Sequence, residues 1–165
     1  MKIYLAGPDV FRPDALAHFA DARALLTAHG HQALIPLDNE ETTASGIYAA
    51  NLGLIRQANA VLANLNPFRG SEPDSGTAFE VGFALALGLP VIGYLDDARP
   101  QIVKLAERQG GELARHNGRP VDADGLGVED FGLPLNLMLA VPCPIVEGRL
   151  AAALQALDAR FPAAT

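Results

Sequence analysis

The chain has 165 residues, half of them hydrophobic, with a formal net charge of −7. This length suits one compact domain covering residues 1–165, and the apolar content is enough for a sizeable core. The acidic balance and the lack of a basic stripe argue against nucleic acid as a partner.

Short apolar runs alternate with helical patterns along the first two thirds of the chain. The runs predict buried strands over residues 2–7, 31–39, 60–66 and 90–95. The helical patterns between and after them cover residues 13–29, 44–58, 75–88 and 100–109. This alternation predicts an α/β fold of Rossmann-like type, a doubly wound parallel sheet with helices on both faces.

The last third of the chain is less regular. Residues 110–132 are rich in glycine and charge and predict an irregular excursion or lid. Residues 133–141 are short and apolar and fit a helix or a strand, whereas residues 146–161 predict an amphipathic C-terminal helix.

Motifs for cofactors and export are missing from the sequence. "AGPDVF" has one glycine, without a dinucleotide fingerprint or a Walker lysine, and the four histidines lack metal-ligand spacing. The single cysteine, Cys143, cannot form an internal disulfide. No apolar run reaches membrane-spanning length or resembles a signal peptide. We therefore expect no cofactor, no metal, no membrane partner and a cytoplasmic location.

Polar residues gather after the predicted strands, where ligands bind in open parallel sheets. Gly7 follows the first strand, Asp38 and Glu40 lie at the end of the second, and Asp74 and Glu80 follow the third. The sequence therefore predicts one site at this edge of the sheet.

Glu80 has two interpretations. "TAFE" fits a capping box in which Glu80 reaches back to the backbone of Thr77, and Asp74 or Ser75 fits the N-cap position. Alternatively, Asp74 and Glu80 form the carboxylate pair that glycosidic bond cleavage commonly uses. The local sequence leaves both open, just as Tyr4 fits an ordinary core aromatic.

Four blocks together resemble the nucleoside 2-deoxyribosyltransferases. They are "IYLAGP", "PLDN", "DSGTAFEVGFALALG" and "LPLNLM", spread in the family's order over residues 3–138. The resemblance implies a flavodoxin-like fold and transfer of 2-deoxyribose between nucleobases through a covalent sugar–enzyme intermediate. The implied partners are deoxynucleosides, free nucleobases and further copies of the chain.

The resemblance also implies roles for single residues. Glu80 takes the position of the nucleophile that attacks C1′ of the sugar, Asp74 that of a carboxylate near the sugar hydroxyl, and Tyr4 orients Glu80. Gly7 borders the base. Asn136 takes the position of a residue that reaches a neighbouring subunit's site and binds the sugar 5′-hydroxyl, which implies a homo-oligomer.

The base side of the site departs from the family pattern. Phe11 and Phe68 would wall the base, and Asp38 is expected to bind substrate at the mouth that it shares with Asp74 and Glu80. Asn51 stands where bacterial members carry an aspartate that contacts the base, and an amide cannot donate a proton as an acid does. Glu40 stands where some members have glutamine and would supply the missing carboxyl group.

Two other activities remain open at this point. One is an N-glycoside hydrolase acting on 2′-deoxynucleosides or their 5′-monophosphates. The other is a nucleoside-binding module without catalysis, since a fold alone never proves a function.

Overall fold

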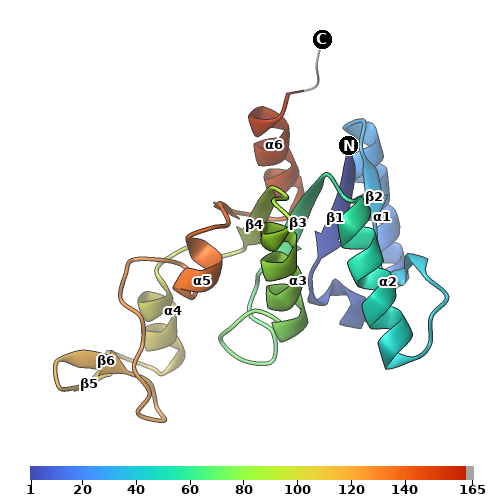
Figure 1. The fold of residues 1–165 in the computed structure, drawn as a ribbon. Helices are drawn as coiled ribbons and strands as arrows, with labels where there is room; N and C mark the ends of the chain where they lie inside the picture. The colour runs from blue at the N-terminus through green and yellow to red at the C-terminus, as the bar shows by residue number, and fades with distance from the viewer. Residues whose placement is uncertain (163–165) are drawn as a thin grey trace.

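The structure, a computed structural model, describes residues 1–162 and is built on a five-stranded sheet (Figure 1). The strands lie in the order β2-β1-β3-β4-β7, and all neighbours are parallel. Their bounds are β1 Lys2–Ala6, β2 Gln32–Leu34, β3 Ala60–Asn64, β4 Val91–Leu95 and β7 Ile145–Glu147. This is the flavodoxin-like order, in which the winding reverses between β1 and β3, and it confirms the predicted fold class.

Helices cover both faces of the sheet. One face packs against α1 (Ala15–Ala28) and α6 (Leu150–Arg160), the other against α2 (Ala44–Gln57) and α3 (Ser75–Ala86). The remaining elements are the 3₁₀ helices η1 (Pro8–Phe11) and η2 (Pro36–Asp38), the helices α4 (Gln101–Arg108) and α5 (Leu137–Ala140), and the strands β5 (Ala114–His116) and β6 (Arg119–Val121).

The first strand divides its side chains between the two faces. Ile3 and Leu5 pack in the core with α1 and α6, whereas Tyr4 and Ala6 pack in the core with α2 and α3. Successive side chains of a strand point to opposite faces, so this division follows from the pleat. Tyr4 thereby lies on the side of the sheet that carries Glu80.

Several predicted elements differ in extent. The strand predicted over 31–39 ends at Leu34 because Pro36, which has no backbone N–H to donate, opens η2. The helix predicted from Pro13 begins at Ala15. Residues 133–141 contain α5, and the excursion over 110–132 carries the antiparallel ribbon β5–β6.

The strand β7 was missed altogether. It has three residues between Pro144 and Gly148, and the helix predicted over 146–161 includes the last two of them, whereas α6 begins only at Leu150. Three residues are too few for a periodic signal, and β7 becomes a strand by pairing with β4.

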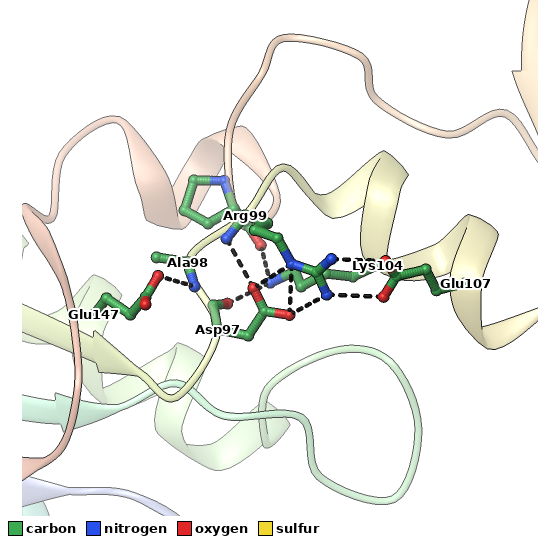
Figure 2. A network of polar contacts seen from close by, with 7 residues as sticks. Asp97, Ala98, Arg99, Lys104, Glu107 and Glu147 are labelled. Carbon is green, nitrogen blue, oxygen red and sulfur yellow. Dashed lines mark hydrogen bonds and ion pairs between the residues drawn. The ribbon is translucent and has the colours of Figure 1, made fainter.

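Beyond the sheet, a polar network joins the loop after β4 to α4, and its labelled members are Asp97, Ala98, Arg99, Lys104, Glu107 and Glu147 (Figure 2). Arg99 donates hydrogen bonds to Asp97 at 2.7 Å and to Glu107 at 2.6 Å. Exposed ion pairs of this kind contribute little stability. In turn, Arg108 on α4 donates to the Gly70 carbonyl at 2.6 Å and so holds the loop that leads into α3.

Candidate active site

A buried tyrosine and a glutamate from distant parts of the chain meet at the centre of the site. Tyr4 lies in β1 and is completely buried, and its hydroxyl donates a hydrogen bond to Glu80 Oε1 at 2.6 Å. Glu80 lies in the second turn of α3, on the helix face turned toward β1. Because Tyr4 is a buried residue of an inner strand, this hydrogen bond ties the position of the carboxylate to the centre of the sheet.

The surroundings of Glu80 oppose its charge. Burial raises the pKa of Glu80 to about 7, and the nearby Asp74 carboxylate raises it as well, while the hydrogen bond from Tyr4 lowers it. The pKa of Tyr4 is raised by burial and by the adjacent glutamate, so the hydroxyl keeps its proton and remains a donor. Glu80 is therefore a carboxyl group whose charge changes near neutral pH.

Asp74 begins the helix that carries Glu80. It is the N-cap of α3, and its Oδ2 accepts from the Thr77 backbone N–H at 2.9 Å and from Thr77 Oγ1 at 3.1 Å. The capping-box interpretation of Glu80 is therefore wrong, because Asp74 caps the Thr77 amide and Glu80 bonds to Tyr4 instead. This cap also brings Asp74 to the edge of the same cavity as Glu80.

A cavity of about 380 Å³ lies beside this pair of carboxylates. Its wall is mostly apolar and is made by η1, η2, α2 and the start of α3. The lining residues are Gly7, Val10, Phe11, Pro36, Leu37, Ile47, Asn51, Asp74, Gly76, Thr77 and Glu80. An apolar cavity with a few convergent polar groups is the usual form of a small-molecule site.

Gly7 occupies the turn where the chain passes from β1 into η1. A Cβ atom at this position would lie 2.8 Å from Asn64 Cβ and 2.9 Å from Asp9 Oδ2, closer than such contacts normally come. Glycine is therefore needed here for the close approach of β1 and β3 at the cavity edge.

The profile of the nucleoside 2-deoxyribosyltransferase family matches residues 3–138, a segment that includes every residue of this cavity. The chain belongs to this family. A solved 2-deoxyribosyltransferase from Leishmania mexicana is 41% identical, with a TM-score of 0.78 and 98% of each chain covered. An uncharacterised protein of Schizosaccharomyces pombe is 31% identical, covering 82% of this chain and 74% of its own. A 2-deoxyribosyltransferase from Bacillus psychrosaccharolyticus is 24% identical, with a TM-score of 0.48, covering 91% of this chain and all of its own.

In this nucleoside 2-deoxyribosyltransferase family member, the two predicted aromatic walls lie together. The rings of Phe11 and Phe68 stack with their centroids 5.3 Å apart, and Phe11 lines the cavity while Phe68 packs behind it. The guanidinium of Arg69 covers both rings, 4.6 Å from the Phe68 centroid and 5.2 Å from that of Phe11. This stack forms one rim of the cavity.

Two predicted carboxylates lie apart from the cavity. Asp38 accepts hydrogen bonds from Arg23 Nη2 at 2.6 Å and from the Ile35 backbone at 3.3 Å. Glu40 is exposed, and neither side chain belongs to the cavity lining. The strand ends before either residue, and the 3₁₀ turn η2 brings Pro36 and Leu37 to the cavity in their place.

Asn136 also lies outside the cavity of its own chain. Its Oδ1 accepts from the Met138 backbone N–H at 3.0 Å and so caps α5, while its Nδ2 donates to Glu129 at 2.9 Å. The role in a neighbouring subunit's site, implied by the resemblance, stays a prediction.

Several lining residues were not singled out from the sequence. They are Val10, Pro36, Leu37, Ile47, Gly76 and Thr77. Sequence spacing could have identified two of them. Ile47 precedes Asn51 by four residues on α2 and so shares its helix face, and Thr77 follows the N-cap residue Asp74 by three residues. The apolar lining residues look like ordinary core residues in the sequence, and only the fold shows that they line the cavity.

Two further properties of residues 1–162 concern metals and membranes. No group of three or more His, Cys, Asp or Glu side chains there is placed to hold a metal ion. None of the helices in that range combines the length and the apolar character that crossing a membrane requires.

Proposed function

We propose that this protein transfers 2-deoxyribose between nucleobases of 2′-deoxynucleosides, through a covalent intermediate on Glu80. The observation that carries the proposal is the Glu80 carboxyl group, held by Tyr4 at 2.6 Å and lining a cavity of about 380 Å³. Family membership supports handling of a deoxyribosyl group, and the buried carboxylate supplies a nucleophile for it.

The reaction runs in two displacements. The ionised Glu80 oxygen forms a bond to C1′ of the sugar, and the C1′–N bond to the base breaks, with its electron pair leaving on the base, which takes up a proton. A second base then attacks C1′ through a ring nitrogen, loses a proton and releases the Glu80 carboxylate. Tyr4 acts as a positioning residue, because its hydrogen bond favours the ionised form of the nucleophile.

Asp74 is assigned to the sugar. Its Oδ2 is engaged by Thr77, and the second carboxylate oxygen, Oδ1, accepts a hydrogen bond from a sugar hydroxyl at the cavity edge. The proximity of the Asp74 charge also stabilises the positive charge that develops on the sugar ring as the base leaves.

The hydrolase alternative uses the same first step, with water replacing the second base. For 5′-monophosphates it also needs a cationic pocket. No lysine or arginine lines the cavity in the part of the chain that the structure describes. Of the two nearby arginines, Arg12 pairs with Asp14 at 2.9 Å, and Arg69 lies over the aromatic stack at the cavity rim. We therefore propose the free deoxynucleoside as the substrate, because the cavity lining within residues 1–162 offers no cation to a 5′-phosphate.

We also propose that the working form is a homo-oligomer in which Asn136 reaches a neighbouring copy's cavity. Close to Asn136, Met138 of α5 and its C-cap residue Val141 expose 72% and 71% of their surfaces, so this end of the chain offers neighbouring apolar side chains to a second copy.

A chromatographic assay tests the proposal. The protein is incubated with 2′-deoxyinosine and free adenine, and the expected products are 2′-deoxyadenosine and hypoxanthine. Hypoxanthine with free deoxyribose alone means hydrolysis. No product from any deoxynucleoside or 5′-monophosphate, with binding retained in wild type and Glu80→Ala, means a non-catalytic binding module.

A further inference from the structure

One residue of the cavity wall, Asn51, carries a buried polar atom that has no hydrogen-bond partner in the described part of the chain. Asn51 Oδ1 is buried and accepts no hydrogen bond from any residue in the range 1–162. The other polar side chains of the wall are engaged: Asp74 with Thr77, and Glu80 with Tyr4. Asn51 therefore stands out as the uncommitted group of the cavity.

A buried acceptor without a partner is costly and rare in folded proteins. Structural asparagines are normally satisfied by backbone or side-chain groups nearby, as Asn39 is by the Pro36 carbonyl and the Glu41 backbone N–H. Because Asn51 lines the cavity, a rotation of its amide about the Cβ–Cγ bond is enough to present either end to a ligand. The Asn51 amide is therefore available to form hydrogen bonds with a ligand in the cavity.

The wall around Asn51 suits a flat ring. Ile47 lies one turn earlier on the same helix, and Leu37 and Phe11 complete an apolar surface. Of the two parts of a deoxynucleoside, the base is the one that matches this surface, while the sugar belongs with Asp74 and Glu80. On the proposed function, Asn51 therefore meets the base.

We infer that Asn51 makes this protein selective for 6-aminopurines over 6-oxopurines. An amide presents one donor beside one acceptor, and adenine presents the complementary pair, the N7 acceptor beside the N6 amino donor. Hypoxanthine and guanine present two acceptors there, N7 and O6, so one end of the amide opposes an acceptor. An aspartate in its ionised form would offer two acceptors and lose the N7 contact.

The N7 edge is the productive one for chemistry. As the C1′–N9 bond breaks, the electron pair passes into the purine ring, and N7 becomes a stronger acceptor. A donor aimed at N7 therefore binds the transition state more strongly than the ground state. Asn51 assists the departure of adenine in this way without transferring a proton.

Calorimetric titration with free bases tests the inference without requiring turnover. We expect wild type to bind adenine about tenfold more tightly than hypoxanthine or 7-deazaadenine, which lacks the N7 acceptor. Asn51→Leu, close in size, should bind adenine and hypoxanthine equally. Ile47→Val, which trims the wall one turn away, should change both affinities alike and keep their ratio.

Equal binding of adenine and hypoxanthine to wild type overturns the inference, and so does the absence of binding of either base to wild type. A preference for adenine that survives in Asn51→Leu overturns it as well. A parallel assay supplies equal adenine and hypoxanthine with 2,6-diaminopurine 2′-deoxyriboside, a 6-aminopurine nucleoside, as donor and compares the two products. Selective binding without transfer leaves the inference standing and removes the proposed function. Transfer to both bases at equal rates, with equal affinities, overturns the inference and leaves the proposed function standing.

Discussion

The Tyr4 hydroxyl donates a 2.6 Å hydrogen bond to the Glu80 carboxylate across the interface between β1 and α3. The two residues are 76 positions apart in the sequence. The contact joins a fully buried strand residue to the carboxyl group that lines the cavity, and it opposes the effect of burial on the Glu80 charge. The protonation state of Glu80 follows from this balance.

Tyr4→Phe removes the hydrogen bond that lowers the pKa of Glu80. The pKa should therefore rise above about 7, so that less of the enzyme carries an ionised nucleophile at neutral pH. We expect turnover at pH 7 to fall about tenfold or more, and the ascending limb of the pH–rate profile to move to higher pH. Tyr94→Phe is the matched control, since Tyr94 is also buried but lies in the core on the α1 side of the sheet. An unshifted limb in Tyr4→Phe contradicts the prediction.

Glu80→Gln should abolish transfer and stabilise the fold at alkaline pH. The pKa of Glu80 rises from 4.5 to about 7 on folding, so the folded state binds the proton more tightly than the unfolded chain. This contribution to stability is complete below pH 4.5 and is lost as the pH rises through 7. We expect the variant to exceed wild type by about 1–3 kcal/mol in free energy of unfolding at pH 8.

Urea unfolding at pH 4 and pH 8 measures this difference. The gain from Glu80→Gln should vanish at the lower pH, where wild-type Glu80 is already neutral. A variant less stable than wild type at both pH values would show that the charged carboxylate supports the fold.

Substitutions of Asp74 separate its two roles. Asn is as good an N-cap as Asp, so Asp74→Asn should stay within about 0.5 kcal/mol of wild-type stability, while Asp74→Ala should lose about 1 kcal/mol. Both should reduce turnover, because neither carries the charge. Removing that charge also lowers the pKa of Glu80, so the ascending limb of the profile should move to lower pH in both variants. Full activity in Asp74→Asn would contradict a role of the Asp74 charge in catalysis and would show that Asp74 acts only as the N-cap of α3.

Gly7→Ala should destabilise the fold by about 1–3 kcal/mol, because the added Cβ meets Asn64 at 2.8 Å and Asp9 at 2.9 Å. The matched control is Gly53→Ala in α2, where nothing lies within 4 Å of the added atom. That change should stabilise the helix by about 0.5–1 kcal/mol. Thermal unfolding of both variants checks the contrast, and equal melting temperatures would refute it.

Mixing two inactive variants tests whether the sites are shared. Glu80→Ala and Asn136→Ala should each be inactive as pure proteins, and subunit exchange between them should restore part of the activity. A mixed oligomer holds some cavities with Glu80 from one copy and Asn136 from another, both intact. Light scattering should show an oligomer. No recovery after verified exchange, or a monomer, would place Asn136 outside any shared site.

Local sequence was sufficient for much of the architecture. The alternation of apolar runs and helical patterns determined the parallel α/β sheet, because buried parallel strands must be apolar on both faces. Asp74 could be proposed as an N-cap from its residue type and place, since capping depends on residues three apart. Helices, strands and caps that depend on residues close together in the chain could therefore be predicted from the sequence.

Contacts between distant segments were decided only by the tertiary structure. Whether Glu80 would cap its own helix or face a cavity depended on Tyr4, which arrives from β1. Asp38 bonds to Arg23 of α1 rather than lining the cavity, and β7 is a strand only because β4 lies beside it. The free energy of a hydrogen bond or a packed side chain depends on which groups the whole fold brings within reach, and no local pattern contains that information.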